Sequence, residues 1–214
     1  MKILNLYAGL GGNRKLWGEE HEITAVEIHP DICKYYKNHY PKDNIFNMDC
    51  INYLETIDSL DRFDFIWASP PCQTHSKLAI YNAKRVPDMT GVLGIQIFLD
   101  KYYDGLYVIE NVQPYWLNSV MIDSHLTKLG RHCFWSNFPI PYREFERTKK
   151  QFPYMTINDL SVDKEIDIPN IEDKTLQRQT LRNCVHPKIG KYILDCAMKK
   201  VKTLDDYVSV SDIS

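Results

Sequence analysis

The chain has 214 residues, of which 44% are hydrophobic and 25% are charged, and this is the composition of an ordinary globular protein. Its formal net charge of −2 provides no basic field over the whole surface, so any site for a polyanion has to be local. The six cysteines are scattered without a C-x-x-C pair, which argues against a structural zinc site and against a disulfide framework.

The sequence shows neither a signal peptide nor an apolar run near the roughly 20 residues that span a bilayer. Scattered cysteines of this kind are typical of a reducing compartment. We therefore expect a soluble, cytoplasmic protein that contacts no membrane, binds no metal, and forms one domain with a small appendage.

The amino-terminal segment predicts a ligand-binding cradle. Residues 2–7 predict a strand, residues 8–12 a glycine-rich turn, and residues 13–17 a short helix. Glycine lets a backbone approach a ligand closely, and a helix N-terminus offers free N–H groups, so this unit is able to hold a nucleotide-like cofactor. It matches neither the dinucleotide motif G-x-G-x-x-G nor a P-loop, and a plain tight turn stays the alternative.

Acidic residues follow the next two predicted strands. Residues 22–28 predict a strand ending at Glu27, and an acidic residue about 20 positions after such glycines can bind both hydroxyls of a ribose. A helix starts near His29, and residues 44–47 predict a third strand with Asp49 just beyond it. Either acid alone is explained as a helix N-cap. The turn, Glu27 and Asp49 together predict one ligand-binding edge, provided that the sheet is parallel.

A cysteine follows a buried strand through a stiff loop. Residues 63–68 are apolar and aromatic, as in a strand that is buried on both faces. Pro70 and Pro71 then restrict φ and remove two backbone donors, so Cys72 is delivered just beyond the carboxyl end of the strand. That edge is where open α/β sheets bind ligands, and a rigidly placed thiol suits a nucleophile. A buried core cysteine is the alternative on this segment alone.

The second half of the chain predicts fewer regular elements. Residues 74–90 form a long loop whose basic side chains can reach phosphates or remain solvated, and Thr90 caps a helix over residues 91–103. Residues 106–109 predict a fifth strand that ends in a carboxylate, Glu110. A helix is expected over residues 118–129, an extended run over 131–140, an irregular insert over 142–173, and a final helix over 180–201 before a frayed tail.

The order of these segments resembles that of the cytosine-5 methyltransferases from Asn5 to about residue 193. Residues 5–12 resemble the cofactor loop D-L-F-A-G-x-G-G, and residues 69–73 resemble the Pro-Cys-Gln nucleophile loop. Residues 110–112 match E-N-V, residues 134–137 resemble F-W-x-N, and Asn183-x-Val185 resembles a late G-N-x-V segment. The resemblance implies S-adenosylmethionine as cofactor, held by Tyr7, Ala8, Gly9, Gly11, Gly12, Glu27, Ile28, Asp49, Cys50, Pro70, Asn183 and Val185.

The chemistry that the resemblance implies is covalent. The Cys72 thiolate adds to C6 of cytosine, which makes C5 nucleophilic enough to accept a methyl group, and Glu110 binds N3 and the exocyclic amine. Arg131 and His132 are candidates for the cationic neighbours that keep the thiol ionised. The base has to flip out of a duplex to reach such a cleft. Further contacts to the substrate are implied for Pro71, Gln73, Ser76, Lys77, Asn111 and Val112.

The sequence departs from the family pattern at several positions. Asn5 replaces the usual aspartate, and Arg182 replaces a glycine. Alignment on Phe134 and Trp135 places His132 and Gly130 where arginines are expected, and Arg131 can substitute from a shifted position. The insert is short for a target-recognition domain. It can make few base contacts, so we expect a short or relaxed target site, or a partner chain that supplies specificity.

We therefore expect an α/β fold of the Rossmann-like methyltransferase type, a mostly parallel sheet with helices on both faces and a small irregular insert. Residues 1–141 form the catalytic and cofactor-binding core, residues 142–175 a target-recognition-like insert, residues 176–202 a segment that returns to the core, and residues 203–214 a frayed tail.

The expected function is methylation of C5 of cytosine in DNA, as in small bacterial or phage enzymes for modification or protection. A tRNA methyltransferase with the same core is one alternative, and a non-catalytic regulatory subunit of a larger methyltransferase is another. A further alternative is a different nucleotide-cofactor enzyme in which the Pro-Pro-Cys sequence is incidental.

Overall fold

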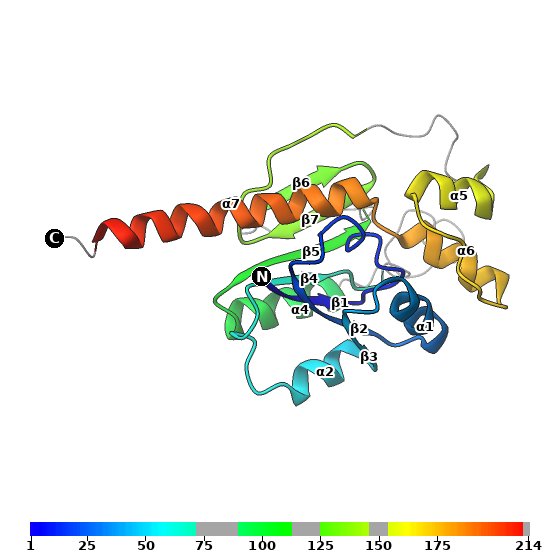
Figure 1. Cartoon of the computed structure of the whole chain (residues 1–214), viewed down its shortest axis with the longest axis horizontal. Coiled ribbons are helices and arrows are strands. Elements are labelled where there is room, and N and C mark those ends of the chain that lie inside the picture. Colours follow the sequence, from blue (N-terminus) through cyan, green and yellow to red (C-terminus); the bar gives the residue numbers. More distant parts are fainter. Residues whose placement is uncertain (72–89, 113–124, 146–153, 212–214) are drawn as a thin grey trace.

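The computed structural model describes residues 1–71, 90–112, 125–145 and 154–211. Within these ranges the strands form one seven-stranded sheet in the order β3-β2-β1-β4-β5-β7-β6 (Figure 1). The strand β7 is antiparallel to both of its neighbours, β5 and β6. The other adjacent pairs in the sheet are parallel. The expected mostly parallel α/β fold is confirmed. The strands are β1 (Lys2–Leu6), β2 (Glu22–Glu27), β3 (Asn44–Asn47), β4 (Phe65–Ala68), β5 (Leu106–Val112), β6 (His125–Leu129) and β7 (His132–Ser136).

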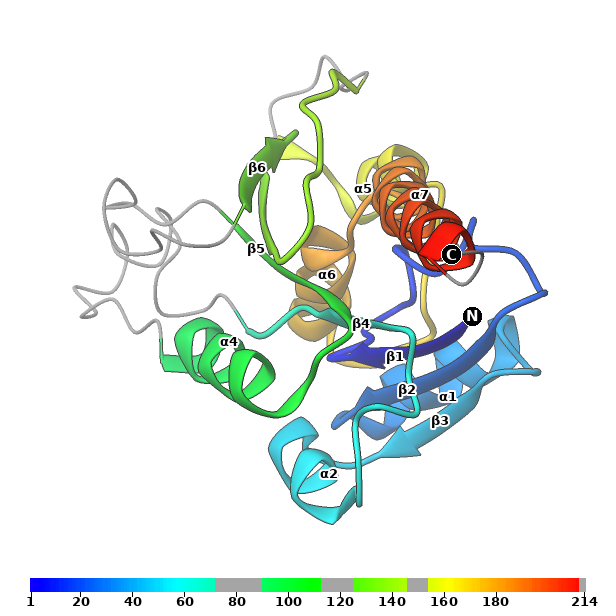
Figure 2. The same ribbon diagram turned by 90° about the vertical axis from the view of Figure 1, so that its left-hand side faces the viewer.

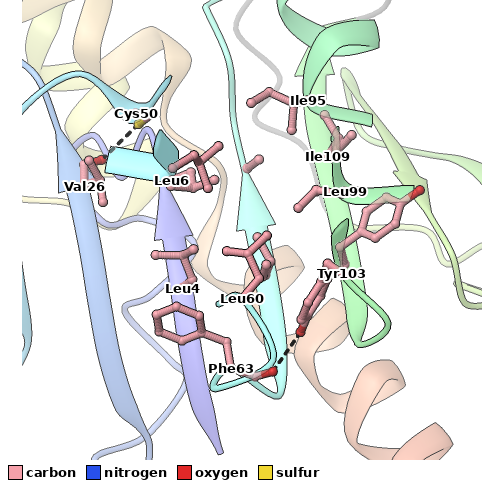
Figure 3. Packing of buried hydrophobic residues seen from close by; sticks show 14 of the residues in the cluster. Leu4, Leu6, Val26, Cys50, Leu60, Phe63, Ile95, Leu99, Tyr103 and Ile109 are labelled. Carbon is pink, nitrogen blue, oxygen red and sulfur yellow. Dashed lines mark hydrogen bonds between the residues drawn. The ribbon is translucent and has the colours of Figure 1, made fainter. Parts of the chain in front are cut away.

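Helices cover both faces of this sheet (Figure 2). Because side chains alternate along a strand, Leu4 and Ile66 face one side, where α2 and α4 pack, as Figure 3 shows for part of this core. Ile3 and Trp67 face the other side and pack against the first half of α7. The helices are α1 (Pro30–His39), α2 (Cys50–Thr56), α4 (Thr90–Tyr102), α5 (Ile157–Lys164), α6 (Lys174–Asn183) and α7 (Pro187–Ser211).

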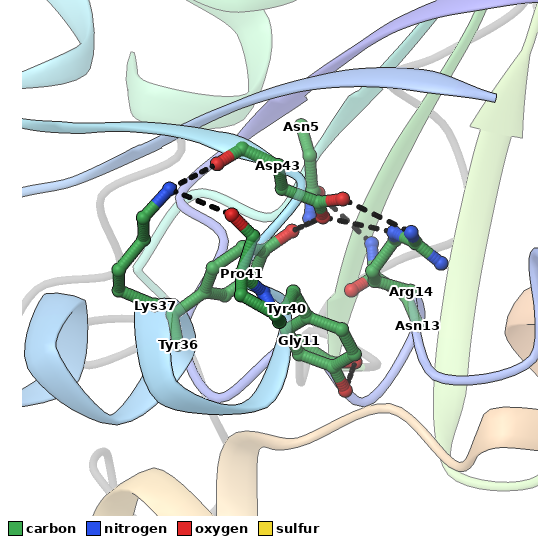
Figure 4. A network of polar contacts seen from close by, with 9 residues as sticks. All are labelled: Asn5, Gly11, Asn13, Arg14, Tyr36, Lys37, Tyr40, Pro41 and Asp43. Carbon is green, nitrogen blue, oxygen red and sulfur yellow. Dashed lines mark hydrogen bonds and ion pairs between the residues drawn. The ribbon is translucent and has the colours of Figure 1, made fainter. Parts of the chain in front are cut away.

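A buried polar network holds the loop that follows β1 (Figure 4). The Arg14 guanidinium donates through Nε and Nη2 to the Asp43 carboxylate at 2.9 and 3.0 Å, and the Tyr36 hydroxyl donates to the same carboxylate at 2.9 Å. The Tyr40 hydroxyl donates to the carbonyl of Gly11 at 2.8 Å. These contacts tie the glycine-rich loop to α1 and to the connection between α1 and β3.

Several expected elements are corrected. Residues 13–17 form a turn closed by Trp17 N donating to Arg14 O, not a helix. Residues 125–129 of the expected helix form β6, which pairs with β7 through a two-residue turn. Gly130 occupies that turn at φ 64°, a conformation that hairpin turns of this length require and glycine adopts readily. Residues 118–124 lie outside the described ranges.

The carboxyl-terminal part is more helical than expected. The single helix expected over residues 180–201 is two helices, broken after Asn183, because the residue before Pro187 is disfavoured in a helical conformation. The helix α7 continues to Ser211, so the expected frayed tail is helical up to that residue. The insert contains α5, which begins with a capping box between Thr156 and Asp159. No helix within the described part of the chain is long and apolar enough to cross a membrane.

Candidate functional site

A cavity of about 280 Å³ lies at the carboxyl ends of the central strands. Its walls come from the glycine-rich turn after β1, the end of β2, the Ser69-Pro70-Pro71 loop after β4, the end of β5, and α6 with the residues that follow it. The residues singled out from the sequence that line it are Tyr7, Ala8, Gly9, Gly12, Glu27, Ile28, Pro70, Pro71, Glu110, Asn111, Val112, Asn183 and Val185.

The glycine-rich turn is hydrogen-bonded to the end of β2. Gly9 has φ 55°, and a Cβ at this position would meet nothing closer than the carbonyl of Tyr7 at 4.0 Å, so there is free space above the turn. Glu27 is buried, and its carboxylate accepts hydrogen bonds from Gly9 N at 3.0 Å and His29 N at 2.9 Å. Glu27 thus fixes the turn as well as lining the cavity.

Gly12 brings the end of α6 against the same turn. A Cβ on Gly12 would lie 2.2 Å from Cys184 Sγ and 2.4 Å from the carbonyl of Val185, so only glycine permits this approach. Burial raises the pKa of the Cys184 thiol to about 11, which keeps it neutral. The close contact places Asn183 and Val185 in the wall of the cavity.

The loop that leads to Cys72 is tied to β5. Asn111 Nδ2 donates to the carbonyl of Pro70 at 2.8 Å, and Asn111 is almost fully buried. The loop is held at its start as well, because Ser69 N donates to the carbonyl of Leu6 at 3.2 Å. Pro71 and Asn111 therefore line the same cavity. Cys72 itself, with Gln73, Ser76 and Lys77, lies outside the described residues.

Glu110 lies within β5 rather than beyond its end, since the strand continues to Val112. It lines the cavity, and its Oε1 lies 2.5 Å from Nδ1 of His132 on the neighbouring strand. Burial lowers the pKa of His132 below the ordinary value, although the carboxylate of Glu110 acts in the opposite direction. The imidazole is accordingly neutral near pH 7.

A second, larger cleft of about 940 Å³ begins behind this pair. Arg131 and His132 line it together with residues of α5 and α7. Lys164 of α5 is buried in its wall, and burial, with Arg131 as a further cause, lowers the pKa of its ammonium group. The structure thus places Arg131 and His132 on the far side of Glu110 from the smaller cavity.

Three residues expected to bind the cofactor support the cavity without lining it. Asp49 is the N-cap of α2, where its carboxylate accepts from Ile51 N at 2.8 Å. Cys50 lies buried beneath the turn, and its Sγ accepts from Tyr7 N at 3.2 Å. Gly11 packs against tyrosine rings of α1 and the residue after it, where a Cβ would find no space.

Sequence reasoning missed the contribution of α6. The N-cap of this helix is Asp173, whose carboxylate accepts from the N–H groups of Thr175 and Leu176. The helix turns Leu176, Gln179 and Thr180 into the cavity. The capping aspartate was a usable signal for the helix, but none of the family motifs in the sequence includes these residues.

The comparisons with known proteins agree with this architecture. The family described as C-5 cytosine-specific DNA methylase matches residues 1–114. The chain belongs to this family. Its matched part contains the glycine-rich turn, both acidic strand ends, the Pro-Pro-Cys loop and the E-N-V sequence of β5.

Two curated relatives are both named tRNA (cytosine(38)-C(5))-methyltransferase. The one from Spodoptera frugiperda is 30% identical over 149 residues, which are 67% of this chain and 43% of the relative. The one from Mus musculus is 25% identical over 126 residues, which are 56% of this chain and 30% of the relative. The chain thus spans less than half the length of either relative.

A solved methyltransferase structure from Entamoeba histolytica has a TM-score of 0.60 and 12% sequence identity with this chain. The alignment covers 94% of this chain and 98% of that one. At this identity the similarity shows the fold, which is that of Rossmann-like methyltransferases.

Proposed function

We propose that the chain methylates C5 of cytosine in RNA, with tRNA as the first candidate substrate and S-adenosylmethionine as the methyl donor. The observation that carries the proposal is one cavity lined by the glycine-rich turn, by Pro71 immediately before Cys72, and by Glu110. A nucleophile, an acid and a cofactor cradle are the groups that covalent cytosine methylation needs in one place.

The residues around the cavity fit the cofactor. The free space above Gly9 admits a ligand close to the backbone, and the buried carboxylate of Glu27 can accept from ribose hydroxyls with the lone pairs that remain. Ile28 is exposed beside it and offers an apolar surface for an adenine ring. When bound, S-adenosylmethionine supplies an electrophilic methyl group.

The protein's own groups act on the base. Cys72, carried by the loop that Asn111 ties to β5, forms a bond to C6 of the cytosine as a thiolate. Glu110 donates to N3 as that bond forms, and accepts from the exocyclic amine. After methylation a base takes the C5 proton, the C5–C6 double bond re-forms as the bond from C6 to sulfur breaks, and N3 returns its proton to Glu110. A base stacked inside a duplex cannot reach a cleft of this kind, so a paired cytosine has to be extruded.

The proposal also assigns a role to each part of the chain. Residues 1–141 serve as the catalytic core, residues 142–175 as a small target-recognition insert, and residues 176–202 as the segment that completes the cofactor site. Support comes from the contact of Val185 with Gly12 and from the packing of α5 of the insert against α6.

RNA is preferred to DNA because both curated relatives described above carry tRNA in their names. DNA is the second candidate, favoured by the description of the matched family as a DNA methylase. The choice is therefore between polynucleotides for the same reaction, and one assay separates them.

The test measures transfer of a labelled methyl group from S-adenosylmethionine to total tRNA, single-stranded DNA and duplex DNA. We expect incorporation into tRNA, abolished in Cys72→Ser, which should still bind the cofactor. A substrate containing 5-fluorocytosine should form a covalent adduct with the wild type alone.

Each other outcome points to another function. Incorporation only into DNA would favour the second candidate, and bisulfite sequencing would then locate the modified cytosines. An adduct that persists in Cys72→Ser would exclude the nucleophile. Cofactor binding without transfer to any nucleic acid would indicate a regulatory subunit, and failure to bind the cofactor would indicate a different enzyme.

A further inference from the structure

The pairing of Glu110 with His132 follows from the antiparallel register of β5 and β7. Glu110 lies opposite Phe134, and Val112 lies opposite His132, so the two side chains project from the same face of the sheet on adjacent strands. Nδ1 of the imidazole lies 2.5 Å from Oε1 of the carboxyl group. Both side chains are buried, at 2% and 5% exposure, so water does not compete for this contact.

The imidazole is a neutral donor in this setting. Burial lowers the pKa of His132. A neutral ring that faces a carboxyl oxygen with Nδ1 carries its proton there, which leaves Nε2 without one. Nε2 is buried and has no hydrogen-bond partner among the described residues, which suits a ring nitrogen without a proton to donate. The titratable groups that act on this ring or on its close neighbours are Glu110, Arg131, Lys164, Asp163 and Cys184.

We propose that His132 is a positioning residue for Glu110, a role that rests on the proposed cytosine methylation. Its Nδ1–H binds Oε1 and thereby leaves Oε2 of Glu110 for the base. As the Cys72 sulfur bonds to C6, the electron pair of the C5–C6 double bond shifts through the ring towards N3, and N3 takes the proton from Oε2. The resulting carboxylate is a stronger acceptor, so the hydrogen bond from Nδ1 strengthens as the adduct forms.

The neutrality of the donor matters for this step. An arginine, which the family pattern has at this position, is charged throughout and attracts the carboxylate both before and after the proton moves. A neutral imidazole instead stabilises the negative charge mainly after the proton has moved. Interactions that are stronger in the transition state than in the resting enzyme are those that accelerate a reaction.

Three substitutions separate the parts of this role. In His132→Phe the ring remains and the donor is lost, and we expect the rate of adduct formation with 5-fluorocytosine-containing tRNA to fall by about 10²–10³-fold. In His132→Gln an amide N–H can replace Nδ1–H, and the loss should stay within about tenfold. In His132→Arg the alkaline limb of the rate profile should move down by about one pH unit or more.

A matched control removes a histidine elsewhere. His39 lies on α1, where Nδ1 contacts the carbonyl of Tyr35, and its side chain is 35% exposed. The variant His39→Gln should keep the wild-type rate and pH profile. Thermal melting and binding of S-adenosylhomocysteine should show that each variant is folded with an intact cofactor site. A purely structural role of His132 would lower stability in these variants without moving the alkaline limb.

A second measurement does not depend on activity. Nitrogen-15 NMR of histidine-labelled protein should show His132 protonated at Nδ1 and not at Nε2, and Glu110→Gln should shift the Nδ1 signal. A ring protonated at Nε2 alone would overturn the inference. So would a His132→Phe enzyme with the rate and pH profile of the wild type. If the wild-type protein forms no adduct, the proposed function is wrong. The NMR result then still decides whether the hydrogen bond between His132 and Glu110 exists.

Discussion

The ion pair between Arg14 and Asp43 offers the sharpest test of how the cofactor loop is held. Both side chains are buried, at 7% and 2% exposure, and the guanidinium donates two hydrogen bonds to the carboxylate. Replacing Arg14 by Met keeps most of the aliphatic stem and removes the charge. The Asp43 carboxylate then remains buried, with the hydroxyl of Tyr36 still donating to it.

Removing one partner of a buried pair costs about 3–5 kcal/mol, because the other charge stays desolvated without compensation. Since the total stability of a domain is about 5–15 kcal/mol, the expected loss is a large fraction of it. In the double variant Arg14→Met/Asp43→Asn neither charge remains. We expect it to be more stable than the sum of the single effects implies, with a coupling energy of about 2–3 kcal/mol.

Urea denaturation, followed by tryptophan fluorescence, measures these differences in unfolding free energy. A shift of the denaturation midpoint with an unchanged m-value reports a change in stability. The neighbouring pair Lys42–Glu19 provides the control, because both side chains are about three-quarters exposed. The variant Lys42→Met should unfold at the wild-type midpoint. If Arg14→Met cost no more than Lys42→Met, the buried network would not be holding this loop, and the reasoning would be refuted.

Three further predictions concern other parts of the structure. Gly12→Ala should lower the unfolding free energy by about 1–3 kcal/mol through overlap with the chain after α6, whereas Gly94→Ala, in an uncrowded stretch of α4, should raise it by about 0.5–1 kcal/mol. Because burial lowers the pKa of His132, the unfolded chain takes up its proton first, so stability should fall as pH drops below about 6.5. Urea titrations across pH should show a shallower decline in His132→Gln, and an unchanged one would contradict the shift. Asn111→Ala frees the carbonyl of Pro70 and should slow adduct formation about tenfold without weakening cofactor binding; an unchanged rate would separate this contact from the chemistry.

Much of the fold could be predicted because the central strands are rich in apolar residues. Residues 2–7, 22–28 and 63–68 all contain central strands that the structure shows, and the helix over residues 91–103 corresponds to α4. The edge strand β3 was also predicted, although most of its residues are exposed. A parallel strand buried on both faces has this pattern whatever lies around it. Edge elements lack it, which explains the error at β6, where a short strand is defined by its turn and its partner rather than by its own composition.

Part of the candidate site could be predicted from the sequence, and part of it could not. Glu27 and the Pro-Pro-Cys loop could be predicted because they follow strands, and a parallel sheet gathers the carboxyl ends of its strands at one edge. The contact between Glu110 and His132 could not be read from the chain, since it depends on β7 entering the sheet antiparallel beside β5. Likewise, residue spacing gave no sign that α6 would close the cavity against the glycine-rich turn.

The walls of the cavity are held by contacts that need no ligand. The N–H of Gly9 binds Glu27, and the amide of Asn111 binds the carbonyl of Pro70. Gly12 packs against the backbone that follows α6. These contacts join segments far apart in sequence, so folding of the chain brings the walls together. A site ordered in advance loses little conformational entropy when it is occupied, and more of the contact energy then serves to position the reacting groups.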